Sequence, residues 1–323
     1  MRVLVLHSDV PPDAPVDEQD TLITARAARD ALQTRGYTTE LATFVPSPDA
    51  FRAILARAKP DVVFNLTESV FGLGQFAPVA CQMLEISGVP FTGTYGAPMA
   101  MTGDKPLTKG LLRAAGLPTP DWSEPPHWSG LDDNRSYIVK HATEDASIGL
   151  DDGAVVSGRE AIAARAKMCA QKYGGRWFAE AFVEGREFNI AVLEEGGQPR
   201  VLPLAEMRFE NWPQGRPTIV GYSAKWDESA LEYNHTVRAF GVEKSEPKLA
   251  AALRDCCERA WKLFGLAGFA RVDFRVDANG SPLILEINPN PGLEPEAGFA
   301  AAAREAGMDY PDVVERILKA ALA

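Results

Sequence analysis

The chain has 323 residues, of which 46% are hydrophobic and 24% charged, an ordinary globular composition whose length predicts two or three domains. Its formal net charge of -11 argues against a broad surface for nucleic acid or for an anionic membrane. Four cysteines without a CxxC pair, and no apolar run of bilayer length, predict a cytoplasmic protein with buried reduced thiols.

Alternating strands and helices are predicted in the first third of the chain. Residues 3–6 form a continuous apolar run, as in a buried parallel strand, and residues 17–35 carry an apolar stripe that ends before Gly36. Further strands are expected at 41–44 and 61–66, and further helices at 51–58 and 77–87. This alternation predicts an α/β domain with a small doubly wound sheet, residues 1–94.

Two further domains are expected after this unit. A helix at 105–115, a strand at 137–140, a helix at 159–172 and a strand at 177–183 predict a compact domain over residues 95–184. From there to residue 323, we expect strands at 187–193, 200–207 and 217–226, a helix at 247–264, a hairpin and two short closing helices.

The hairpin from Ala270 to Leu293 carries oxygen ligands in an apolar setting. Asp273 lies on its first strand, the "DANG" turn reverses the chain, and Glu286 and Asn288 share one face of the second strand. Two carboxylates and an amide oxygen suit magnesium, with manganese as the alternative, and a magnesium ion held this way implies a nucleotide phosphate. Arg271 lies on the same face, where it could hold a carboxylate or stabilise the charge of a tetrahedral intermediate. The alternative is a solvated hairpin with ordinary surface acids.

Three lysines and a loop of small residues suggest phosphate binding. Lys105, Lys140 and Lys225 lie at the boundaries of apolar elements, although a single lysine is usually a solvated surface group. In "HATEDASIGL", Ser147 and Gly149 could close over phosphates through backbone amides and a hydroxyl. The chain has neither GxxxxGK[ST] nor GxGxxG, so it contains no Walker A or Rossmann site. An ordinary polar loop is the alternative.

Acids and a glycine at two turns complete the candidate residues. Glu180 and Glu187 flank the turn at Gly185, where one carboxylate could accept from an adenine amino group and the other from ribose hydroxyls. Gly292, in "NPNPGL", could let backbone amides approach a substrate carboxylate or an oxyanion. Exposed turn acids and a plain turn are the alternatives.

The order of these residues resembles the ATP-grasp superfamily, in particular its D-alanine–D-alanine ligase branch. The resemblance is most specific in "RVDF…LEINPNPG" and strong in "DKPLTKGLLRAAGLPTP". It implies a three-domain ATP-grasp fold: an N-terminal preATP-grasp domain, a central lid domain and a C-terminal grasp domain, with ATP between the last two. It also implies a homodimer through the N-terminal domain.

The resemblance also implies a role for each matched residue. Those expected at the nucleotide are Lys105, Lys140, Ser147 and Gly149 at the phosphates, Glu180 and Val183 at adenine, Glu187 at ribose, and Lys225 at the γ-phosphate. Those expected at the metal are Asp273, Glu286 and Asn288, and the expected catalytic residues are Arg271, Lys225 and Ser147.

Several departures from the ligase branch concern the substrate. Glu18 is matched to the glutamate that the ligase branch carries after its first strand, and Glu68 is positioned to meet a substrate ammonium. The aromatic residue after Lys225 is Trp226, a bulkier side chain on the substrate side. "NPNPGLEPEAGF" has no serine or threonine for the acceptor carboxylate; Glu294 and Glu296 stand there, and would repel a carboxylate or bind an amine.

These features predict an ATP-dependent carboxylate–amine ligase that acts on amino acids or small peptides. It would activate a carboxylate as an acyl phosphate and join it to an amine, releasing ADP and phosphate. D-alanine–D-alanine ligase proper, an ATP-grasp small-molecule kinase, and a nucleotide-binding protein without turnover are the alternatives. Expected partners are small-molecule substrates, with no nucleic acid and no membrane.

Overall fold

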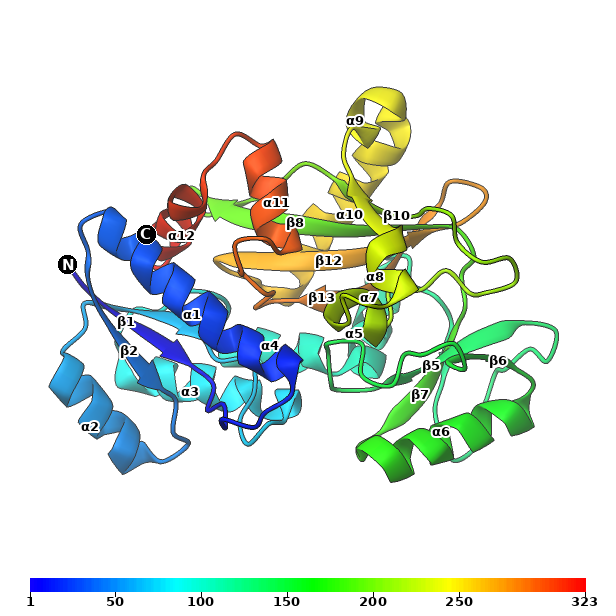
Figure 1. Ribbon diagram of the computed structural model, residues 1–323, viewed down its shortest axis with the longest axis horizontal. Helices are drawn as coiled ribbons and strands as arrows, with labels where there is room; N and C mark the ends of the chain where they lie inside the picture. The colour runs from blue at the N-terminus through cyan, green and yellow to red at the C-terminus, as the bar shows by residue number, and fades with distance from the viewer.

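The computed structural model describes the backbone of residues 1–323 and every side chain except that of Asp17. Three β-sheets follow one another along the chain, and each is covered by helices (Figure 1). The N-terminal sheet lies at the left of the view, the middle sheet at the lower right, and the largest sheet across the top. No helix of the described chain combines the length and apolar character needed to cross a membrane. The cytoplasmic location stays a prediction.

The N-terminal sheet is parallel, with the strand order β2-β1-β3. Its strands are β1 (Arg2–His7), β2 (Thr38–Thr43) and β3 (Val62–Leu66). Val3 and Val5 of β1 pack with α1 (Val16–Thr34), whereas Leu4 and Leu6 pack on the opposite face with α2 (Pro48–Ala58) and α3 (Ala77–Ser87). The sheet is therefore covered on both faces, which confirms the predicted doubly wound unit.

The middle sheet is antiparallel, with the order β4-β7-β5-β6. Its strands are β4 (Trp122–Ser123), β5 (Ser136–His141), β6 (Val155–Ser157) and β7 (Trp177–Ala181), and α6 (Arg159–Tyr173) covers one face. Two helices precede it, α4 (Gly96–Gly103) and α5 (Lys105–Ala114). Leu112 of α5 packs in the core of the largest sheet rather than in that of the middle sheet. The predicted domain limits at residues 94 and 184 stay predictions, because a helix between them contributes to the core of the largest sheet.

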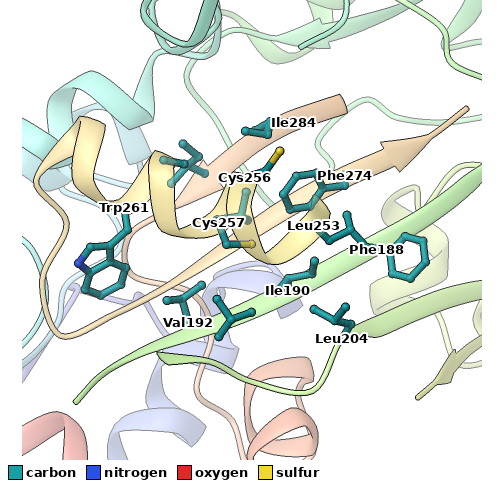
Figure 2. Close-up of a cluster of buried hydrophobic side chains, with 14 of the residues drawn as sticks. Phe188, Ile190, Val192, Leu204, Leu253, Cys256, Cys257, Trp261, Phe274 and Ile284 are labelled. Carbon is teal, nitrogen blue, oxygen red and sulfur yellow. The ribbon is translucent and has the colours of Figure 1, made fainter. Parts of the chain in front are cut away.

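The largest sheet has the order β11-β10-β8-β12-β13, with β9 paired to β8. Its strands are β8 (Arg186–Glu195), β9 (Gln198–Val201), β10 (Ala205–Phe209), β11 (Thr236–Ala239), β12 (Phe269–Val276) and β13 (Pro282–Asn288). Helix α10 (Pro247–Phe264) has the bounds predicted from the sequence. Its residues Leu253, Cys257 and Trp261 belong to one buried cluster with Phe188 of β8 and Phe274 of β12 (Figure 2). Strand alternation places polar residues on the opposite face.

The opposite face of this sheet divides into two parts. At one end, Leu193 and Phe269 pack with α11 (Gly298–Glu305) and α12 (Tyr310–Ala320), which also contact α1. In Figure 1, α12 accordingly lies beside the blue helix α1. The shared core fixes the N-terminal sheet against the largest sheet. At the other end, Arg271, Asp273 and Arg275 of β12 line a cavity.

Two strand predictions were wrong in the stretch before the hairpin. Residues 200–207 form β9 and β10 with a break between them, since Pro203 has no N–H for the ladder. Residues 217–226 form no strand: Ile219 packs with Ile138 of the middle sheet, and Tyr222–Trp226 is helix α7. The free edge of β10 is taken by β11 instead. The remaining elements are η1 (Gly74–Phe76), α8 (Leu231–His235) and α9 (Val242–Ser245).

Candidate active site

A cavity of about 1250 Å3 lies where the three sheets meet, and it gathers residues from across the whole chain. Of the residues predicted for the site, all line this cavity except Gly149. Gly149 has a φ of +71° and lies against Trp177, whose ring would be 2.6 Å from a Cβ at this position. The structure therefore assigns Gly149 to the packing of the loop, and not to the cavity wall.

The predicted metal residues share one face of the β12–β13 hairpin. The antiparallel register pairs Asp273 with Glu286, and Arg271 with Asn288, next to a bulge after Asp273. Arg271 donates from Nε and Nη2 to the two carboxylate oxygens of Asp273, each at 2.8 Å. Among the described side chains, no three His, Cys, Asp or Glu residues form a metal cluster. A cation here would bind two carboxylates, the Asn288 amide oxygen and oxygens of a bound phosphate.

Three lysines surround Glu286. Burial opposes ionisation of this carboxyl, but Lys105, Lys140 and Lys225, together with Arg271, hold its pKa down at about 2. It is therefore ionised at neutral pH, as a metal ligand must be. Lys105 Nζ lies 3.8 Å from Glu286 and donates to Asp145 at 2.8 Å.

Lys225 differs from the other two predicted phosphate lysines. Lys105 and Lys140 each hold a carboxylate, whereas Lys225 makes no hydrogen bond or ion pair with any described side chain. Burial and the nearby Arg271 lower its pKa. An unpaired, desolvated ammonium beside the hairpin is a site for an anion.

The loop between β5 and β6 is fixed at both ends. The His141 ring accepts from the backbone N–H groups of Thr143 and Glu144, and burial and Lys105 lower its pKa to about 4. Ser147 donates its hydroxyl proton to the Val220 carbonyl at 2.9 Å. In this conformation, the hydroxyl that was predicted to bind a phosphate is hydrogen-bonded instead to the segment that leads into α7.

Glu180 and Glu187 are not the exposed turn acids of the alternative interpretation. Glu180 is 1% exposed and is held between Lys140, at 2.7 Å, and Lys109. Glu187 is 8% exposed and lies 2.9 Å from Arg275. Both carboxylates line the cavity, but in this structure both are engaged with cations rather than free to accept from a nucleotide.

Sequence reasoning missed Lys109 and, apart from Val183, the apolar wall near Glu180. Lys109 is fully buried and lies one helical turn after Lys105 on α5, so the i,i+4 spacing was the signal that could have identified it. The apolar wall comprises Ile138, Leu150, Phe182, Val183, Met207, Ile219 and Leu285. These residues come from the middle sheet, the largest sheet and the loops beside them, so nothing local in the sequence predicts that they meet.

The far end of the cavity is acidic. Burial, with Asp20 and Asp145 nearby, raises the pKa of Glu68 to about 8, and burial with Glu294 nearby raises that of Asp20 to about 6. Glu18 lies beside this group, with Oε1 3.7 Å from a Cβ placed on Gly72. The crowded carboxyls would ionise fully next to a bound cation.

The "NPNPGL" turn and Trp226 bound this acidic end. Gly292 faces open space, since a Cβ there would meet nothing within 4 Å. Trp226 donates from Nε1 to the Ala146 carbonyl at 3.4 Å and so connects α7 to the loop. The prediction placed Glu296 with Glu294, but the Glu296 side chain is 79% exposed and lies 3.6 Å from Arg304. Of the two, Glu294 is the one close to Asp20.

Comparison with known proteins identifies relatives over most of the chain. Residues 134–319 match the family described as D-ala D-ala ligase C-terminus. An uncharacterized protein of Sinorhizobium fredii is 35% identical over 290 residues, 89% of this chain and 80% of that protein. A D-alanine–D-alanine ligase of Moorella thermoacetica is 32% identical over 286 residues, 85% of this chain and 87% of the relative.

A solved structure shares the whole fold. The D-alanine–D-alanine ligase from Bacillus anthracis complexed with ATP superposes with a TM-score of 0.76 at 18% sequence identity. The match covers 100% of this chain and 97% of that one, which confirms the ATP-grasp fold expected from the sequence.

Proposed function

Because the chain belongs to the D-alanine–D-alanine ligase family, and is therefore an ATP-dependent carboxylate–amine ligase, we propose that its substrates are amino acids or small peptides. One substrate is activated as an acyl phosphate at the expense of ATP, and the amine of the other displaces the phosphate to give an amide. The observation that carries this proposal is that Asp273, Glu286 and Asn288 share a hairpin face inside a cavity where Lys225 makes no ion pair with any described side chain.

The nucleotide is assigned to the side of the cavity between the middle and the largest sheet. The apolar wall defined above suits an adenine ring, with Glu180 and Glu187 beside it. Lys105 and Lys140 are placed to bind phosphate oxygens by exchanging part of their present carboxylate contacts, and Lys225 is placed at the γ-phosphate. Ser147 would join them once its loop closes over the phosphates.

Magnesium fits the hairpin, with manganese as the alternative. Asp273, Glu286 and Asn288 would hold it, since they offer hard oxygen atoms and Glu286 stays ionised at neutral pH. Bound there, the ion would neutralise charge on the phosphates during transfer.

The chain's own residues supply positioning and charge stabilisation. Arg271, fixed by its two hydrogen bonds to Asp273, presents the rest of its guanidinium to the reaction centre. Lys225, bound to the γ-phosphate, would hold it in line with the attacking carboxylate. Closing the loop around Ser147 would exclude water from the acyl phosphate, which water would otherwise hydrolyse.

The acidic end of the cavity is assigned to substrate ammonium groups. Glu68, Asp20 and Glu294 crowd there, with Glu18 at the edge, and a cation would relieve their mutual repulsion. Trp226 and Gly292 bound this space. D-alanine–D-alanine ligase proper remains the second candidate, because the relatives named for that activity match most of the chain.

We also propose a homodimer formed through the N-terminal sheet. Around that sheet, Phe71, Ile86 and Tyr95 expose large apolar side chains, 79%, 85% and 54% respectively. Light scattering coupled to gel filtration would test it: a dimer that becomes monomeric in Ile86→Asp/Tyr95→Asp supports the proposal, and a monomeric wild type contradicts it.

A phosphate-release screen tests the reaction. ATP, magnesium and all pairs of amino acids in both configurations are assayed, and active pairs are analysed by mass spectrometry. We expect ADP, phosphate and an amide, all abolished by Asp273→Asn; the control Asp255→Asn, exposed on α10 outside the cavity, should leave activity intact. A stable phosphorylated product without an amide would instead indicate a kinase.

A further inference from the structure

One cationic side chain on the substrate side of the cavity has no partner among the side chains that the structure describes. Four arginines line the cavity, and three of them hold a carboxylate: the pairs are Arg176–Asp104, Arg271–Asp273 and Arg275–Glu187. The fourth, Arg238, makes no hydrogen bond or ion pair with any described side chain. Arg238 is half-buried, and desolvating a guanidinium without an anion is unfavourable, so its place in the cavity favours an anionic ligand.

The surroundings of Arg238 are basic rather than acidic. It lies on the edge strand β11, paired in register with Met207 of β10, and its Nη2 is 3.5 Å from a Cβ built on Gly298 at the start of α11. Burial, Arg271 and Arg304 all lower its pKa, and no carboxylate opposes them. The nearby charges therefore add to the demand for an anion at this point.

A second polar group beside Arg238 is also unsatisfied. Thr236 lies two residues earlier on β11, so its side chain is on the same face of the strand, and it too lines the cavity. The Thr236 hydroxyl is buried and has no hydrogen-bond partner among the described residues. A guanidinium and a hydroxyl on one strand face form a pair of donors for a single carboxylate.

The nucleotide does not account for this site. The charges that act on Arg238 are those of Arg271, at the hairpin, and Arg304, on α11. The lysines assigned to phosphates interact instead with Asp145, Glu180 and Glu286. Although its register partner Met207 belongs to the apolar wall, the Arg238 guanidinium lies at the start of α11, where only arginine charges act on it.

On the basis of the proposed ligase activity, we propose that Arg238 binds a carboxylate of the amine-bearing substrate, assisted by Thr236. The acceptor is then an amino acid or a peptide, and not a simple amine. The acidic end of the cavity takes its cationic part, and Arg238 takes its anionic part. This assignment replaces the expectation, drawn from Glu294 and Glu296, that the acceptor pocket would reject a carboxylate.

The geometry of a guanidinium makes this site selective. Its planar guanidinium donates two parallel hydrogen bonds to one carboxylate, a geometry that the ammonium of a lysine cannot reproduce. A ligand with a neutral carboxamide in place of the carboxylate fits this pair of donors poorly. A buried polar site that loses its partner typically discriminates by about 10- to 100-fold or more. We therefore expect the wild type to prefer an acceptor acid over its carboxamide by about 30-fold in kcat/KM.

The test compares acceptor pairs in Arg238→Gln, Arg238→Lys and a control. The acceptors are the best amino acid from the panel of both configurations and its own carboxamide, with the donor and ATP held saturating. Arg208→Gln is the matched control: Arg208 lies on the adjacent strand β10, contacts Glu206, and does not line the cavity.

We expect Arg238→Gln to raise the acceptor KM by about 30-fold and to bring the acid-to-amide preference near unity, with KM for ATP and donor unchanged. Arg238→Lys should recover part of the loss, and Arg208→Gln should match the wild type. The melting temperature of Arg238→Gln should not fall, because the substitution removes repulsion from Arg271 and Arg304.

Each contrary result has a distinct meaning. An unchanged acid-to-amide preference in Arg238→Gln, or a best acceptor that carries no carboxylate, would overturn the role of Arg238 while leaving the ligase activity in place. If no pair gave an amide, the proposed function itself would fail, and this inference with it.

Discussion

Replacing Lys109 by methionine tests the buried charge cluster under the apolar wall. The Lys109 side chain is 0% exposed, contacts the Glu180 carboxylate, and donates to Thr119 Oγ1 at 2.9 Å. Methionine fills a similar volume and retains helix propensity, so the substitution mainly removes the charge and the two contacts.

The expected loss can be worked out from these contacts. Removing one partner of a buried ion pair typically costs about 3–5 kcal/mol. Because Lys140 still lies 2.7 Å from Glu180, we expect the lower end, about 3 kcal/mol, together with about 1 kcal/mol for the hydrogen bond to Thr119. Glu180→Gln should cost about 4–5 kcal/mol, since it leaves both lysines without a carboxylate.

Urea unfolding followed by circular dichroism measures these losses. Lys167→Met, at an exposed position of α6, is the control and should stay within about 0.5 kcal/mol of the wild type. In Lys109→Met/Glu180→Gln, the losses should fall short of additivity by about 2 kcal/mol, because the two groups share one interaction. Additive losses, or a Lys109→Met protein as stable as the control, would refute this account of the cluster.

Three further predictions concern the cavity and its loop. Burial raises the pKa of Glu68, so its contribution to stability is present below its ordinary pKa of about 4.5 and is lost as the pH rises toward 8. Glu68→Gln should flatten this decline in thermal melts from about pH 5 to 9, and an unaltered pH profile would contradict the prediction. Lys225→Met should lower kcat by about 100-fold or more, while the melting temperature stays the same or rises. A near-normal kcat in steady-state kinetics would contradict a role for Lys225 in stabilising the transition state. Gly149→Ala should lower the free energy of unfolding in urea by about 1–3 kcal/mol, because Gly149 has a positive φ and a Cβ at this position would meet the Trp177 ring. The KM for ATP of the folded variant should be near normal, and a large rise in this KM would indicate that Gly149 contacts the nucleotide.

Where the chain's pattern is local, the sequence predicted the structure closely. Helix α10 has the predicted bounds, because Pro247 begins it, Gly265 ends it, and its apolar stripe is continuous between them. The hairpin followed from the "DANG" turn and the two-residue period, which together fix that Asp273, Glu286 and Asn288 share a face. The failure at residues 217–226 has the opposite cause: a run rich in β-formers became loop and helix, because the sheet edge it would have occupied is filled by β11.

The sequence by itself predicted residues that the structure brings to one cavity, since motif order and spacing are properties of the covalent chain. Only the tertiary structure decided which charges neutralise one another and which remain free. Lys109 and Glu180 are 71 positions apart, Arg275 and Glu187 are 88 apart, and no local pattern records that they meet. For the same reason, Arg238 looks like any surface cation in the sequence, and nothing local to Lys225 shows that it makes no ion pair. Neither makes an ion pair with any described side chain, a result of the folding of three sheets around one cavity, and this is why we propose a phosphate and a carboxylate as their ligands.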